Sequence, residues 1–145
     1  MSYNKNRLSQ LRRSEVIVHY RMIHTCIRVM DLEKSLIFYK EALGLIEKRR
    51  KDFPEHSFTL VYLSDTFSNY ELELTYNYDQ DKPYEIGNGY SHMAVETEDL
   101  QSSYAKHQEM GYQVSKLIGL PGSEPTYYFV TDPDGYRVEV IKASE

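Results

Sequence analysis

The sequence contains one cysteine, no tryptophan and no long apolar run. A single cysteine, Cys26, excludes an internal disulfide and agrees with a reducing compartment. No stretch approaches the roughly 20 apolar residues of a membrane-spanning helix. The start of the chain also lacks the pattern of a signal peptide. We therefore expect a cytoplasmic protein with no membrane partner.

An excess of positive charge is also missing. Lys and Arg together number 17 against 22 Asp and Glu, so the net charge is −5. This balance argues against a nucleic-acid partner. The apolar content of 41% and charged content of 27% are ordinary for a globular protein, and 145 residues suffice for one domain with a sizeable core.

The beginning of the chain differs from the remainder. Residues 1–13 are polar and basic, and residues 16–18 read Val-Ile-Val. We interpret residues 1–21 as an N-terminal leader that is flexible or adds a short strand. Residues 22–145 then form a single domain.

The same half-motif occurs twice in that domain. Each copy begins with a histidine, has an aspartate seven residues later, and ends with a glutamate 49 or 47 residues after the histidine, which gives His24, Asp31 and Glu73, and then His92, Asp99 and Glu139. An internal duplication must be identified before the fold is interpreted. Here it also has chemical meaning, because two histidines and two glutamates are a plausible ligand set for one divalent metal.

Each copy has the pattern of a strand, a helix and further strands. Alternating apolar and polar residues predict strands over residues 22–29, 57–63, 70–77, 90–96, 126–131 and 136–142. The two aspartates are good N-caps for helices over 32–43 and 99–110, each followed by a glycine stop. The predicted fold class is α+β, with duplicated βαβββ modules at about 22–80 and 88–142. They form a curved mixed sheet with the helices outside.

Strand alternation provides a test of the metal hypothesis. His24 shares a strand face with Cys26 and Arg28, whereas Ile27 and Val29 point the other way. The three other candidates likewise lie opposite apolar neighbours: Glu73 opposite Leu72 and Leu74, His92 opposite Met93 and Val95, Glu139 opposite Val138 and Val140. If helices cover the apolar stripes, the four candidate ligands line the concave side of the sheet.

Taken singly, a histidine or glutamate on a strand is more often a surface residue than a ligand. The matched spacing of four such residues is what favours a metal site. His19, His56 and His107 have no such counterpart, and we expect them at the surface. Cys26 is expected to be a packing residue near the site, because no base is placed to activate its thiol.

Four segments resemble the glyoxalase I family of the vicinal oxygen chelate superfamily: residues 24–29, 71–77, 91–94 and 132–139. The resemblance covers about residues 22–142 and implies βαβββ modules that form a U-shaped metal site. It implies metal ligands at His24, Glu73, His92 and Glu139, with one divalent metal per site. It also implies a homodimer whose sites lie between subunits, two ligands coming from each chain. The compact length resembles that of the short bacterial enzymes of this family, and this likeness implies nickel before zinc.

The same resemblance implies a lyase of methylglyoxal detoxification. Its substrate is the hemithioacetal of methylglyoxal and glutathione, and its product is S-D-lactoylglutathione. One carbon loses a proton and its neighbour gains one, while a Lewis-acidic metal stabilises the enediolate between them. Glu139 is the expected main base and Glu73 its partner. Arg28 and Asn77 match the pair that holds the γ-glutamyl end of glutathione.

Three departures from the family pattern are visible. Ser91 stands where glycine is common, Asn88 where some relatives have arginine, and residues 120–125 lack a basic residue that many relatives use for the glycyl carboxylate. We therefore expect weak binding of the glycyl end of glutathione.

Two alternative functions remain: an epimerase-type proton shuttle, which typically has glutamine in place of Glu73, and a metal-free resistance module that binds a small molecule. The full ligand set argues against both.

Overall fold

The computed structural model describes residues 16–145, so the expectation for residues 1–15 lies outside the described part. The remainder of the leader, residues 16–21, and the next two residues form neither helix nor strand and expose their large apolar side chains: Val16, Ile17, Val18, Tyr20, Met22 and Ile23. Within residues 16–145, no helix has the length and apolar character needed to cross a bilayer.

The first module is a complete βαβββ unit. Its elements are β1 (His24–Arg28), α1 (Leu32–Ile37) continued by a π-helical turn (Phe38–Ala42), β2 (Ile46–Phe53), a 3-10 turn (Pro54–His56), β3 (Phe58–Ser64) and β4 (Glu71–Asn77). The strand order is β1-β4-β3-β2, and β1 runs parallel to β4. Asp31 caps α1 as expected, because its side chain accepts a hydrogen bond from the Lys34 N–H. Strand β2 was not delimited from the sequence, since its charged residues hide the alternation.

The second module repeats this order but forms only isolated bridges where the first module has β2. It contains β5 (Met93–Thr97), α2 (Leu100–Glu109), β6 (Tyr127–Thr131) and β7 (Arg137–Lys142), in the sheet order β5-β7-β6. Strand β5 is parallel to β7, as β1 is to β4. In place of a strand equivalent to β2, two isolated bridges join Val114 to Val130 and Ile118 to Tyr127.

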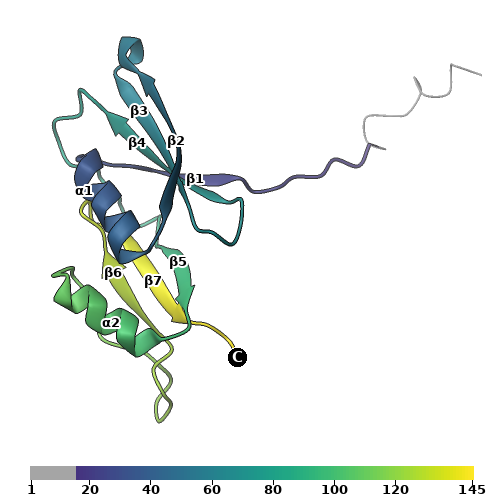
Figure 1. Ribbon diagram of the computed structural model, residues 1–145, viewed down its shortest axis with the longest axis vertical. Helices are drawn as coiled ribbons and strands as arrows, with labels where there is room; N and C mark the ends of the chain where they lie inside the picture. The colour runs from purple at the N-terminus through teal and green to yellow at the C-terminus, as the bar shows by residue number, and fades with distance from the viewer. Residues whose placement is uncertain (1–15) are drawn as a thin grey trace, which may run out of the picture.

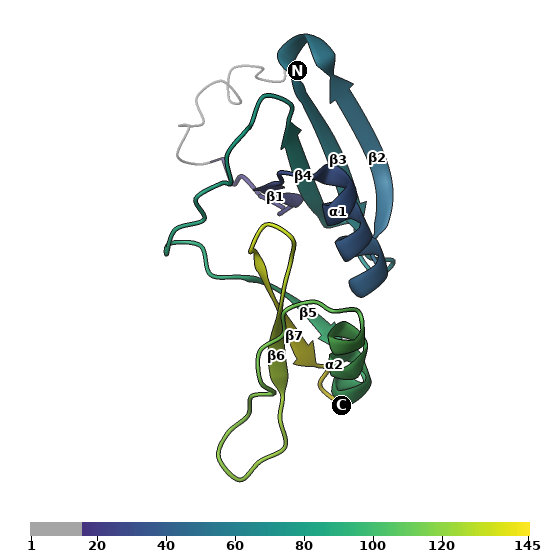
Figure 2. The ribbon, with the colours of Figure 1, turned by 90° about the vertical axis from the view of Figure 1, so that its left-hand side faces the viewer.

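The expected α+β fold of two related modules is confirmed, and within one chain its sheet is divided in two. The two sheets follow one another along the length of the molecule (Figure 1). Turned by 90°, the view shows both helices on the same side (Figure 2). The apolar strand faces contribute the core as predicted, with buried side chains that include Ile27, Val29, Leu72, Leu74, Val138 and Val140.

Polar contacts join the two modules around the turn before β7. The buried Asp132 carboxylate accepts hydrogen bonds from the Tyr39 hydroxyl (2.7 Å) and from the backbone N–H groups of Asp134 and Tyr136. The Tyr136 hydroxyl in turn donates to the Arg28 carbonyl at 2.9 Å. The end of β1 is thereby fixed to the start of β7, and these two strands carry candidate ligands from different modules.

His107 corrects one expectation from the sequence. It is not at the surface but 1% exposed, within α2. Its Nε2 atom lies 2.8 Å from the Ala42 carbonyl oxygen and must donate to it, which leaves Nδ1 to accept from the Tyr128 hydroxyl at 2.7 Å. Burial lowers the pKa of His107. This histidine is a neutral link between the modules, whereas His19 and His56 are exposed as expected.

Asp132 generates a prediction about stability. Burial raises its pKa from 3.8 to about 6, so the folded state holds the proton more tightly than the unfolded state. Its stabilising contribution is therefore present below about pH 4 and is lost as the pH rises through 6. Asp132→Asn removes this titration while its amide oxygen still accepts the backbone bonds. We expect the unfolding free energy of the variant, relative to the unsubstituted protein, to rise by roughly 2–3 kcal/mol between pH 4 and pH 7.

Urea unfolding at several pH values measures this difference. Asp81→Asn, which changes an exposed aspartate, is the matched control. Parallel pH curves for Asp132→Asn and the unsubstituted protein would contradict the role given to burial.

Candidate metal centre

The first candidate half-site lies on the parallel strands β1 and β4. The strand register pairs His24 with Glu71 and Cys26 with Glu73, so His24 and Glu73 are diagonal neighbours on one face. The His24 Nε2 atom lies 3.0 Å from Glu73 Oε2. His24 is exposed, whereas Glu73 is buried. An imidazole nitrogen and a carboxylate oxygen at this separation can ligate one ion together.

The second half-site repeats the arrangement on β5 and β7. His92 directly precedes β5, and its Nε2 atom lies 2.7 Å from Oε2 of Glu139 on β7. Ser91 is a residue whose role the sequence did not suggest, because its hydroxyl lies 2.7 Å from His92 Nδ1. If Nε2 binds a metal, Nδ1–H donates to Ser91 and the ring orientation is fixed. The serine that departs from the family pattern therefore supports the histidine.

One chain does not bring the two pairs together. Among residues 16–145, no three histidine, cysteine, aspartate or glutamate side chains gather closely enough to hold a metal. Each pair belongs to a different sheet, and the sheets occupy different ends of the molecule (Figure 2). The donor set of each half-site fits a divalent ion in kind, but each half supplies only two protein ligands.

The two glutamates have different surroundings. The Thr75 hydroxyl donates to Glu73 Oε1 at 3.4 Å and lies 3.2 Å from the Cys26 sulfur. In the second module, Glu139 is opposite Ala94 in the register and is followed two positions later by Ile141. Glu73 is thus held by a hydroxyl, whereas the equivalent positions beside Glu139 are apolar.

Cys26 lies beside the site as the sequence analysis expected, but it is exposed and not a packed residue. Partial burial raises the pKa of its thiol, the neighbouring Glu73 carboxylate acts in the same direction, and the hydrogen bond with Thr75 opposes them. A raised pKa keeps the thiolate, which is the nucleophilic form, scarce near neutral pH. Cys26 therefore contributes to the wall of the site and not to covalent chemistry.

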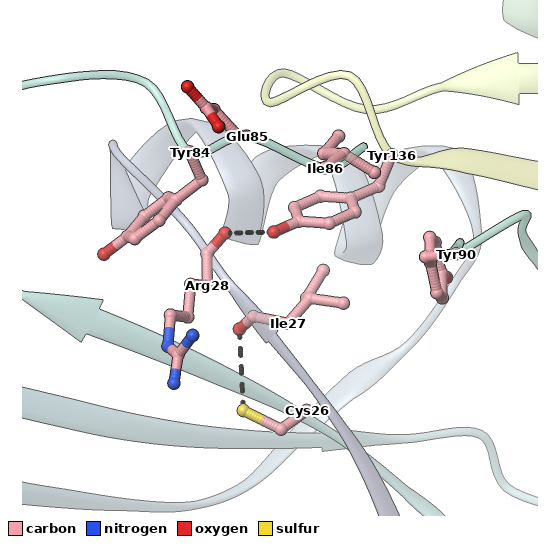
Figure 3. Close-up of a pocket in the computed structure, with 8 residues that line it drawn as sticks. All are labelled: Cys26, Ile27, Arg28, Tyr84, Glu85, Ile86, Tyr90 and Tyr136. Carbon is pink, nitrogen blue, oxygen red and sulfur yellow. Dashed lines mark hydrogen bonds between the residues drawn. The ribbon is translucent and has the colours of Figure 1, made fainter. Parts of the chain in front are cut away.

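A hollow of about 350 Å³ adjoins the first half-site and contains Arg28 (Figure 3). The figure shows Arg28 and Tyr84 together at one end and Tyr90 at the other. Asn77, the expected partner of Arg28, donates from its Nδ2 atom to the Tyr84 hydroxyl at 3.0 Å. No sequence pattern pointed to Tyr84, because this loop residue reaches Asn77 only through the tertiary structure. The Asn77 amide nitrogen is thereby engaged, and its side-chain oxygen accepts no hydrogen bond from residues 16–145.

Comparison with known proteins shows the family to which the chain belongs. Residues 21–140 match the family described as Glyoxalase/Bleomycin resistance protein/Dioxygenase superfamily. The lactoylglutathione lyase of Neisseria meningitidis serogroup A is 41% identical over 84% of this chain and 90% of its own. That of Escherichia coli O157:H7 is 34% identical over 86% and 94%.

A solved structure, the trypanothione-dependent glyoxalase I of Leishmania major, superposes with a TM-score of 0.75 at 36% identity, covering 86% of this chain and 87% of that one. The sequence identity, the coverage and the shared fold all point to the same assignment. The chain belongs to the glyoxalase I, or lactoylglutathione lyase, family within the glyoxalase/bleomycin resistance protein/dioxygenase superfamily.

Proposed function

We propose that the protein isomerises the hemithioacetal of methylglyoxal and glutathione to S-D-lactoylglutathione. The observation that carries the proposal is the pair of His–Glu half-sites with Nε2–Oε2 distances of 3.0 and 2.7 Å. They occur in a chain 41% identical to a lactoylglutathione lyase. An epimerase-type shuttle is disfavoured by Glu73, and a metal-free binding module by the presence of all four ligands.

The metal would be held by His24 and Glu73 of one chain and by His92 and Glu139 of a second copy. Support for this arrangement is that the two pairs lie on separate sheets and no larger ligand group forms within the described residues of one chain. When bound, a divalent ion supplies Lewis acidity that stabilises negative charge on adjacent substrate oxygens. Nickel is our first candidate and zinc the second.

The two carboxylates would move the proton. We assign Glu139 as the main base, because its neighbours Ala94 and Ile141 offer it no side-chain hydrogen bond, and His92 is its one polar side-chain partner within residues 16–145. Glu73 also accepts a hydrogen bond from Thr75, which engages one of its oxygens. Glu139 takes the proton from the carbon that bears sulfur and hydroxyl and returns it to the neighbouring carbon. Arg28 and Asn77 would hold a carboxylate of glutathione at the hollow beside β1.

Metal content is the first test. We expect about one divalent ion per chain, because each chain contributes one complete set of ligands to the dimer. Elemental analysis of purified protein should show this stoichiometry, and His24→Ala and His92→Ala should each lose most of the metal. His56→Ala, which changes an exposed histidine in the 3-10 turn that belongs to neither pair, is the matched control. Full metal retention by the His24 and His92 variants would refute the ligand assignment.

The second test concerns the base. Glu139→Gln keeps the shape of the side chain but cannot accept the proton, so we expect kcat to fall by roughly 10²–10⁴-fold. Glu73→Gln should reduce kcat less. Lyase assays on variants whose metal content has been checked separate proton transfer from metal loss. A near-normal kcat for Glu139→Gln would show that another group is the base.

The third test concerns shared sites. As homodimers, His24→Ala and His92→Ala each have a lesion in both sites. In a mixed dimer one site carries both lesions and the other carries none. Subunit exchange between the two inactive variants should therefore recover activity, up to about half of normal per mixed dimer. Exchange that is demonstrated by mass labelling but restores no activity would instead indicate sites built within single chains.

A further inference from the structure

Each candidate histidine ligand forms a T-shaped pair with an aromatic ring on the strand that runs antiparallel to the strand of its glutamate. The His24 and Tyr62 ring centroids are 6.0 Å apart, those of His92 and Phe129 are 5.3 Å apart, and both pairs are T-shaped. Tyr62 is paired in the register with Glu73, and Phe129 with Glu139. The two rings therefore occupy equivalent positions in the two modules.

A guanidinium covers the face of each ring, but the two arginines come from different places. Arg49 on β2 lies 3.6 Å from the Tyr62 centroid, and Arg137 on β7 lies 3.8 Å from that of Phe129. Arg137 stands two residues before Glu139, where the first module has Glu71 two residues before Glu73. The second module has thus placed a cation where the first has an anion.

The consequence is a difference in free charge. Arg49 is paired with Glu71, with an Nη2–Oε1 distance of 2.8 Å and a second bond from Nε at 3.4 Å. Arg137 forms no ion pair within residues 16–145 and is exposed. It lines a second hollow, of about 380 Å³, whose wall also includes Asn88 and Ser91. The Arg49 guanidinium is therefore neutralised by Glu71, whereas the Arg137 guanidinium is available to bind an anion.

We propose that Arg137 binds a carboxylate of the thiol substrate at the second half-site. This inference rests on the proposed function and extends it to a residue that sets thiol specificity. Arg137 shares the strand face of Glu139 and lies roughly 7 Å from it along β7. Its planar fork can hold a carboxylate through two parallel bonds while it stays stacked on Phe129.

A count of charges supports the assignment. Glutathione carries two carboxylates, and the faces that bear the candidate ligands offer two guanidiniums without ion pairs in the described part of the chain, Arg28 and Arg137. Arg137 supplies the cation that residues 120–125 lack. With Arg137 as its partner, the glycyl carboxylate of glutathione is no longer expected to bind weakly.

Steady-state kinetics with three thiols tests the proposal. The hemithioacetals of methylglyoxal are formed with glutathione, with glutathione amidated at the glycyl carboxylate, and with glutathione amidated at the γ-glutamyl α-carboxylate. Arg137→Met keeps a side chain over Phe129 but removes the charge, and Arg137→Lys restores the charge. Lys142→Met removes a charge from the same strand on the opposite face and is the matched control. Arg28→Met is the comparison for the first half-site.

We expect Arg137→Met to raise KM for glutathione roughly tenfold with kcat changed less than twofold, as for loss of uniform binding. The KM of Arg137→Lys should lie between those of Arg137→Met and the unsubstituted protein, and Lys142→Met should leave KM unchanged. With the one analogue that lacks the carboxylate held by Arg137, the methionine variant and the unsubstituted protein should have equal KM. That analogue identifies which carboxylate is bound.

Two outcomes would overturn the inference alone: an unchanged KM for glutathione, or an equal rise for all three thiols, which would assign Arg137 to packing against Phe129. Absence of isomerisation by the unsubstituted, metal-loaded protein with every thiol would overturn the proposed function, and this inference with it.

Discussion

In each module, two parallel strands place a histidine and a glutamate on one face, and this placement holds only while the opposite face is buried. Ile27 and Val29 behind β1, and Val138 and Val140 behind β7, are almost fully excluded from solvent. A slip of one residue in either strand would turn the ligand toward the core and an apolar side chain toward the site. The hydrophobic stripe therefore fixes the positions of the candidate metal ligands.

The two modules share one backbone arrangement, but they differ in the side chains that surround their glutamates. Glu73 has a hydroxyl neighbour, Thr75, whereas the matching position beside Glu139 is Ile141. In the first module Arg49 forms an ion pair with Glu71, whereas in the second Arg137 has no ion pair within residues 16–145. Such divergence is how two carboxylates of one type can be assigned different tasks by their environments.

Much of this arrangement could be predicted from the sequence, because it depends on local periodicity. The alternation in β1, β4 and β7, the aspartate caps and the repeated His–Glu spacing are all visible in single segments. The π-helical turn, the burial of His107 and the division of the sheet could not be predicted, since they depend on contacts between the modules. Strand β2 was missed for a different reason. It is an exposed edge strand of charged residues, so burial imposes no pattern on it.

We propose that two half-sites from two chains form one metal centre. Anomalous X-ray diffraction from nickel-loaded crystals, recorded on both sides of the nickel absorption edge, tests it most directly. We expect one anomalous peak per chain between two copies, ligated by His24 and Glu73 of one and by His92 and Glu139 of the other. A peak ligated within a single chain, or at residues other than these four, would contradict it.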